Sequence, residues 1–164
     1  MGKKVFVKCT LNWARLMESN RDMGPKDGSD VAEKIDSVQG FYTADCIIDE
    51  DTKEKMIKDG IPNKGLQAQL FKKNADGDMF YKAKRGHFNP KFRDENGNPG
   101  VVMGPPKVLK KTDNGYEAWD WETDGLIGNG TEAEVKFDVW DGKITTLEAV
   151  CVTKLVQYVP EEKF

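Results

Sequence analysis

The chain has 164 residues, of which 38% are hydrophobic, and a formal net charge of −3. This size and composition fit one globular domain with a modest core. No apolar run is long enough to span a bilayer, and residues 1–4 lead straight into a strand pattern without a signal-peptide core, so we expect an intracellular protein. The three cysteines are odd in number and far apart, which argues against a disulfide framework.

The first half of the chain predicts strands around a single helix. Residues 5–11 alternate between apolar and polar side chains, which is the period of a half-buried strand. Further strands are expected at residues 42–48, 66–71 and 79–85. Asp49 or Asp51 can cap a helix that ends at Gly60.

The second half of the chain predicts more strands, separated by glycine turns. They are expected at residues 101–108, 116–121, 133–139 and 144 to about 159. The last of them is apolar on both faces, which favours an interior place in a sheet. The polar segments 19–37 and 87–100 are expected to be long loops. Many short strands, one helix and several glycine turns together favour a small barrel or sandwich.

The charge of the chain is unevenly distributed. Residues 72–111 carry ten Lys or Arg against four Asp or Glu, a local charge of +6, so the rest of the chain sums to −9. Aromatic side chains, including Phe80 and Tyr81, are interleaved with these basic residues. Single-stranded nucleic acid binds such surfaces, because its phosphates need positive charge and its exposed bases stack on flat side chains. The alternative is an ordinary solvated surface.

The sequence also resembles a known family. Residues 125–131, with the turn Gly128-Asn129-Gly130, and the segments 134–137 and 147–156 resemble the C-terminal half of bacteriophage single-stranded DNA-binding proteins of the OB-fold type. The order of elements matches those proteins in the front half as well, at residues 13–16, 41–48 and 80–84.

The resemblance implies a mostly β fold, a five-stranded Greek-key OB barrel with one helix and long loops at residues 1–159, and a short C-terminal tail at residues 160–164. It implies binding of single-stranded DNA with little sequence preference, which protects and organises the strand during phage DNA replication and recombination in the host cytoplasm. It implies neither catalysis nor a cofactor.

The resemblance also implies partners besides DNA. Homodimers are common in the family, and an acidic tail that ends in an aromatic residue recruits replication proteins. The chain ends at Phe164, which fits that role, but the tail is short and Lys163 dilutes its charge. A frayed terminus is the alternative interpretation.

This interpretation assigns DNA contacts to particular residues. The phosphates are expected along Lys82, Lys84, Arg85, Lys91, Arg93 and Lys107. Bases are expected to stack on Phe80, Phe88, Phe92, Trp140 and Trp13, with Arg15 pairing a phosphate beside Trp13. Adjacent strand residues point to opposite faces, so Phe80, which shares a face with Lys82 and Lys84, is favoured for stacking and Tyr81 for the core.

The other aromatic residues have competing interpretations. Phe137 alternates with apolar residues and is expected in the core, and a buried position is the ordinary alternative for Trp13. Trp119 and Trp121 are expected to share one face of a short strand, where acidic neighbours argue against phosphate contact. They could stack bases, or one of the two could fill the core.

Two other classes of function stay open. A metal-dependent nuclease could use carboxylates such as those of residues 49–51, or Asp120, Glu122 and Asp124, which would share a strand face. However, the only histidine, His87, has no Cys or carboxylate partner at ligand spacing. We therefore expect no enzymatic activity. A β-sandwich module for carbohydrate or peptide could use exposed tryptophans without needing the basic segment. Salt dependence separates the DNA and sandwich hypotheses, because only polyanion binding releases counterions.

Overall fold

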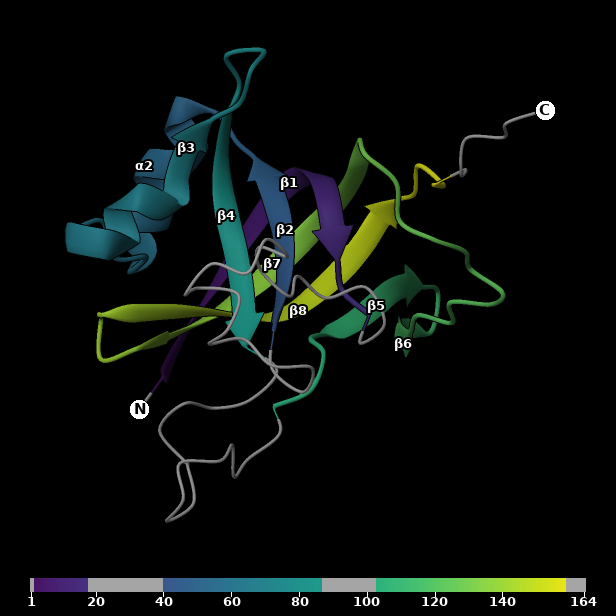
Figure 1. The fold of residues 1–164 in the computed structure, drawn as a ribbon. Helices are drawn as coiled ribbons and strands as arrows, with labels where there is room; N and C mark the ends of the chain where they lie inside the picture. Colours follow the sequence, from purple (N-terminus) through teal and green to yellow (C-terminus); the bar gives the residue numbers. More distant parts are fainter. Residues whose placement is uncertain (1, 18–39, 87–102, 159–164) are drawn as a thin grey trace.

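The computed structural model describes residues 2–17, 40–86 and 103–158, and within them the fold is mostly β, as predicted (Figure 1). Eight strands form one sheet in the order β3-β4-β2-β1-β7-β8-β5-β6. The strands are β1 (Gly2–Arg15), β2 (Phe41–Ile47), β3 (Phe71–Lys73), β4 (Met79–Gly86), β5 (Lys107–Thr112), β6 (Gly115–Ala118), β7 (Thr131–Trp140) and β8 (Ile144–Lys154). The same residues contain the α-helix α2 (Glu50–Asp59) and the 3-10 helix η2 (Gly65–Leu70).

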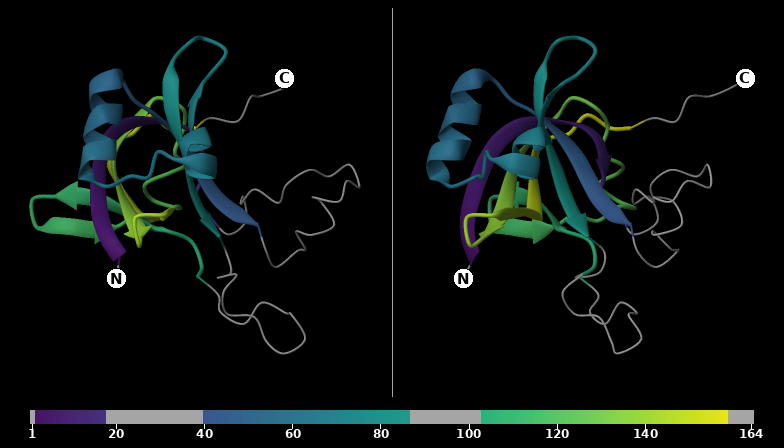
Figure 2. Two further views of the ribbon diagram at one scale, coloured as in Figure 1. Left: turned by 90° about the vertical axis from the view of Figure 1, so that its left-hand side faces the viewer. Right: turned by 60° about the vertical axis from the view of Figure 1, so that its left-hand side comes forward.

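Strand β1 joins the two parts of the sheet. It pairs antiparallel with β7 along residues 2–11 and with β2 along residues 10–15. Figure 2 shows it as a strongly curved strand with α2 beside it. Val5 and Val7 are buried and Lys4 is exposed, as the alternation predicts. Within the described residues the sheet is open, because no backbone pairing joins its end strands β3 and β6.

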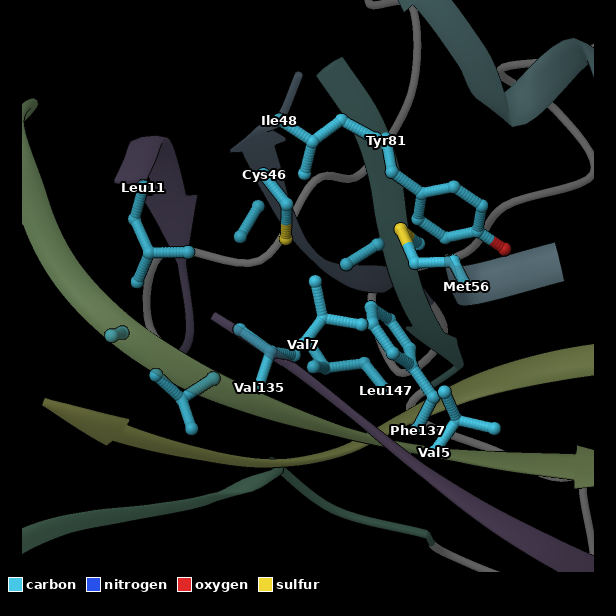
Figure 3. Packing of buried hydrophobic residues seen from close by; sticks show 14 of the residues in the cluster. Val5, Val7, Leu11, Cys46, Ile48, Met56, Tyr81, Val135, Phe137 and Leu147 are labelled. Atoms are coloured by element: carbon cyan, nitrogen blue, oxygen red, sulfur yellow. The ribbon is translucent and has the colours of Figure 1, made fainter. Parts of the chain in front are cut away.

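The core lies on the inner side of the curved sheet, where apolar side chains from β1, β2, β4, β7, β8 and α2 meet (Figure 3). Tyr81 and Phe137 are fully buried there and pack edge to face, with ring centroids 5.4 Å apart. The prediction that both belong to the core is confirmed. Burial raises the pKa of Tyr81 to about 12, because a phenolate would be poorly solvated in this apolar environment.

Helix α2 has the ends that the sequence predicts. The Asp49 side chain accepts a hydrogen bond of 2.7 Å from the Thr52 backbone N–H, and this bond lowers the pKa of Asp49. Gly60 ends the helix with a φ of 122°, a conformation that glycine adopts without steric cost. Met56 is the buried residue of the helix and anchors it to the core.

The strand predicted at residues 66–71 is wrong. Residues 65–70 form η2, and strand β3 begins only at Phe71. Gly65 has a φ of 58°, outside the extended region, and Leu66 is 78% exposed. The short apolar run therefore does not supply one inward face, as a strand would.

The second half of the chain also differs from the prediction in three places. Residues 103–106 of the strand predicted at residues 101–108 are not strand, and β5 begins only at Lys107. Strand β8 lies between β7 and β5, so its interior place is confirmed, but it ends at Lys154. The strand predicted at residues 116–121 is replaced by β6 and a turn, in which the Asp124 N–H donates to the Asp120 carbonyl at 2.7 Å. Because β6 ends at Ala118, neither the two tryptophans nor the carboxylates Asp120, Glu122 and Asp124 lie on a strand, so they share no strand face.

The loops expected at residues 19–37 and 87–100, and the tail at residues 160–164, lie outside the described residues. Among the helices in the described part of the chain, none has the length and apolar character needed to cross a membrane.

Candidate nucleic-acid interface

Four of the predicted contact residues lie on one outer face of β1, β2 and β4. Arg15 lies opposite Thr43 in the register, and Thr43 lies opposite Lys84. Lys82 and Phe80 occupy the next alternate positions of β4, so they point to the same face as Lys84. We call the residues Arg15, Phe80, Lys82 and Lys84 the β4 face. Arg15 and Lys84 are exposed, whereas Phe80 and Lys82 are half-buried.

A bulge in β1 places Arg15 on this face. From Asn12 to Arg15 strand β1 advances three residues, whereas its partner β2 advances only two, from Asp45 to Thr43. One residue of β1 is therefore extra, which is the definition of a β-bulge. In a regular strand Arg15 would point away from the face of Asn12 and toward the core. The bulge turns its side chain outward.

Trp13 lies within this bulge and is strongly exposed. Its side chain is 67% exposed, and its backbone has a φ of 52°, in the left-handed region. A residue other than glycine loses roughly 1–2 kcal/mol in this conformation, so the surrounding structure must hold it there. The Trp13 N–H donates to Asn129 Oδ1 at 2.8 Å. The buried alternative for Trp13 is thus excluded, and its ring faces solvent.

The positive charge of the β4 face is partly compensated. The Lys82 ammonium pairs with Asp45 Oδ1 at 2.9 Å. Both side chains are mostly shielded from solvent, with 25% of Lys82 and 13% of Asp45 exposed. Arg15 and Lys84 form no ion pair with any carboxylate of the described residues. These two side chains are the exposed cations that the face offers to a ligand.

A second group of predicted residues lines a hollow of about 370 Å³ between β4, β5, β7 and β8. Arg85, Lys107 and Trp140 contribute to its wall, together with the carboxylates Asp138 and Glu148. Lys107 and Trp140 are exposed, Trp140 to 47%. The hollow therefore combines an aromatic ring with charges of both signs.

Arg85 has a structural role in this hollow. Its guanidinium donates to the carbonyls of Gly104 at 2.9 Å, Met103 at 3.0 Å and Leu147 at 3.3 Å. Burial lowers its pKa, because the surrounding protein solvates the charge less well than water does. The bond to Leu147 ties β4 to β8, and the bonds to Met103 and Gly104 tie β4 to the segment before β5. Together they leave the Arg85 side chain fewer donors for a phosphate.

A β-hairpin and a cluster of ion pairs hold the other lining residues of this hollow in place. Asp141 and Gly142, between β7 and β8, have φ values of 53° and 66°, as the tight turn after Trp140 requires. Lys4 pairs with Glu148 at 2.9 Å and with Asp138 at 3.5 Å. The hydrogen bond to Glu148 is the main cause of the raised pKa of Lys4.

Trp119 and Trp121 lie beyond the end of β6, outside the strands that carry the β4 face. Their rings pack edge to face at 6.4 Å, and the Trp119 indole N–H donates to the Gly125 carbonyl at 3.0 Å. Trp121 packs against the core, so it is the core member of the pair. Both rings line a hollow of about 350 Å³ with Leu16, Met17, Pro105, Pro106 and Val108.

The Gly-Asn-Gly turn forms a rigid support next to Trp13. The Gly128 N–H donates to the Val156 carbonyl at 2.7 Å, and a Cβ on Gly128 would lie 2.8 Å from that same oxygen. Only glycine allows this close approach. Thr131 is fully buried, and its hydroxyl accepts from the Val156 N–H at 3.0 Å. The sequence indicated the turn, but it gave no signal that Asn129 accepts from the bulge or that Asn12 accepts from the turn.

Several predicted contacts cannot be placed. Phe88, Lys91, Phe92, Arg93 and Phe164 lie outside the described residues. Among the residues that are described, no three His, Cys, Asp or Glu side chains are close enough together to hold a metal ion.

Comparison with known proteins gives no further assignment. No family model matches this sequence, and no curated protein matches it. The exposed aromatic and cationic side chains described above are therefore the features that bear on the function of this protein.

Proposed function

We propose that this protein binds single-stranded DNA with little sequence preference, and that it protects and organises the strand during phage DNA replication and recombination. The observation that carries the proposal is Trp13, an exposed ring in a left-handed backbone conformation, next to the outward Arg15. A base stacks on the ring and the adjacent phosphate pairs with the guanidinium. Lys84 continues the phosphate path along the β4 face.

We further propose that β1, β2, β4, β7 and β8 are the five strands of an OB-type barrel. Their contiguous order in the sheet, β4-β2-β1-β7-β8, supports this proposal, as does the curved β1 shared by both halves. The hydrogen bond from Arg85 to Leu147 brings the outer two of these strands together. Strands β3, β5 and β6 are then additions to the barrel.

The basic segment supports the proposal only through its exposed members. Of its eight described cations, Lys82 and Lys110 are ion-paired at 2.9 and 2.8 Å, and Arg85 binds backbone carbonyls. The others are exposed and available to phosphates: Lys72, Lys73, Lys84, Lys107 and Lys111. The acidic remainder of the chain limits unselective adhesion to other polyanions.

The biological setting follows from the family resemblance alone. It includes the host cytoplasm, a homodimer, and replication proteins that bind the C-terminal Phe164. DNA binding by the β4 face and Trp13 does not depend on any of these three.

The test is a tryptophan fluorescence titration with oligo(dT), repeated with duplex DNA and at several salt concentrations. We expect strong quenching by the single strand alone and an affinity that falls with salt by roughly 0.7 log unit per log unit of salt for each neutralised phosphate. An absence of both quenching and gel shift would contradict the proposal.

A carbohydrate- or peptide-binding module is the second candidate. The hollow around Trp140, Asp138 and Glu148 favours it, because a ring beside carboxylates can hold a sugar or a basic peptide. Such binding would change little with salt. The nuclease alternative has less support, because Asp124 is ion-paired with Lys110 and Asp120 accepts turn hydrogen bonds.

A further inference from the structure

Two asparagines, Asn12 and Asn129, make reciprocal hydrogen bonds between segments that are 116 to 118 residues apart in the sequence. The Trp13 N–H donates to Asn129 Oδ1 at 2.8 Å, and the Gly130 N–H donates to Asn12 Oδ1 at 3.1 Å. Each side chain thus binds the backbone of the residue that follows the other asparagine. The Gly130 N–H also donates to the Leu11 carbonyl at 2.9 Å. Together these bonds join the bulge of β1 to the Gly-Asn-Gly turn.

The bulge needs this external partner. Its extra residue interrupts the β1–β2 ladder, so the backbone N–H groups there lack their usual strand partner. The ring of Trp13 is 67% exposed, so side-chain packing does little to stabilise the left-handed backbone. The bond to Asn129 Oδ1 satisfies the Trp13 N–H, so it acts directly on the backbone of the bulge.

Asn129 is itself held in place by the second half of the chain. The Tyr158 N–H donates to the Leu126 carbonyl at 3.0 Å, and the Gly128 N–H donates to Val156 at 2.7 Å. The Thr131 hydroxyl donates to the Gly128 carbonyl at 2.8 Å. The asparagine therefore projects from a turn that is bonded on both sides, and it can fix the position of Trp13.

We propose that Asn12 and Asn129 are positioning residues for nucleotide binding. They hold Trp13, and through the bulge Arg15, as a preformed platform for one nucleotide, with the base on Trp13 and the phosphate on Arg15. This inference rests on the proposed function. Preformation raises affinity, because the site loses less conformational freedom when the strand binds.

The binding test compares Asn129→Ala with Trp13→Ala, with the double variant and with the control Asn114→Ala, a change to an exposed turn asparagine. The probe is oligo(dT), measured by fluorescence anisotropy of a labelled strand. We expect Trp13→Ala to weaken binding about tenfold and Asn129→Ala about three- to tenfold. The loss of binding free energy in the double variant should be smaller than the sum of the two single losses, because most of the effect of Asn129 acts through the Trp13 ring and only the remainder through Arg15. Additive losses, or an Asn129→Ala variant equal to the control, would overturn the proposal.

A second measurement does not need DNA. In amide hydrogen exchange by NMR, Asn129→Ala should speed exchange of the Trp13 N–H at least about tenfold, whereas the Gly130 N–H stays protected by Leu11. Asn129→Asp keeps an acceptor oxygen and should retain the protection. If wild type binds no single strand yet the Trp13 amide loses protection in Asn129→Ala, the proposed function fails and the positioning of the Trp13 backbone stands. If that amide is equally protected in both proteins, the positioning role is wrong.

Discussion

At the scale of single residues, Trp13 combines exposure with an unfavourable backbone conformation. Its φ of 52° is a conformation in which glycine is favoured, and its ring is 67% exposed. A residue that served only the fold would avoid both properties. Strained backbone of this kind concentrates at binding sites, where the surrounding structure holds it in place. The backbone conformation of Trp13 therefore lowers the free energy of unfolding, while its ring stays exposed to solvent.

This conflict can be measured by comparing Trp13→Gly with Trp13→Ala. Both changes remove the ring, so both should weaken binding of oligo(dT). Glycine adopts the left-handed conformation freely, so we expect Trp13→Gly to be about 1 kcal/mol more stable than Trp13→Ala in urea unfolding. Equal stability of the two variants would show that the backbone at this position is not strained.

Tyr81 gives a prediction about pH. Its pKa is about 12 in the folded protein, above the value of about 10 for an exposed tyrosine. Below pH 10 both states are neutral, and between pH 10 and 12 only the unfolded state ionises, so stability falls as the pH rises through this window. The full loss is on the order of 2–3 kcal/mol.

The measurement is urea unfolding at pH 8 and at pH 11 for wild type and Tyr81→Phe. The variant should lose less stability between the two pH values, because its ring cannot ionise. Tyr116→Phe is the control, since Tyr116 is 63% exposed, and it should behave like wild type. If the free energy of unfolding of Tyr81→Phe falls between pH 8 and pH 11 as steeply as that of wild type, ionisation of Tyr81 is not the cause of the loss.

At the scale of elements, β4 separates two roles on its two faces. Lys82 and Lys84 point outward, whereas Tyr81, Ala83 and Arg85 point inward. Arg85 links β4 to β8 through a side-chain hydrogen bond to the Leu147 carbonyl. Two adjacent cations on one strand, Lys84 and Arg85, should therefore respond differently to mutation.

We expect Arg85→Ala to lower the free energy of unfolding by about 2 kcal/mol, because three carbonyl groups lose a charged donor. Lys84→Ala, on the exposed face, should change stability by less than about 0.5 kcal/mol. Urea unfolding of the two variants side by side tests this expectation. Equal losses would mean that the bonds of Arg85 to the backbone contribute nothing to folding.

Elements were predictable where local patterns agree with the tertiary structure. The alternation in β1, β4 and β7 and the caps of α2 are such cases, because capping and period-two burial are local properties. The prediction of a strand at residues 66–71 was wrong, because a short apolar run does not distinguish a strand from a helix. The inward position of Arg85 was also readable, since it alternates with Tyr81 and Ala83, but its charge suggested a surface role.

At the scale of the whole molecule, the candidate site depends on contacts that no local pattern reveals. The bonds between Asn12 and Gly130, and between Asn129 and Trp13, join segments that are 118 and 116 residues apart in the sequence. A bulge changes which face a residue occupies, so the period of two could not have placed Arg15. The sequence nominated Trp13 and Arg15, and only the register shows why both point outward.

The distribution of charge over the molecule leads to the last prediction. Although the chain carries a net charge of −3, only exposed cations without a carboxylate partner can release counterions from DNA. Arg15→Ala and Lys84→Ala should each reduce the salt slope of oligo(dT) binding by about 0.7, and the double variant by about 1.4. Lys110→Ala removes an equal charge, but Lys110 is paired with Asp124 at 2.8 Å, so the slope should stay at its wild-type value. If Lys110→Ala lowers the slope as much as Lys84→Ala does, DNA binding depends on the net charge of residues 72–111 and not on contacts with the β4 face.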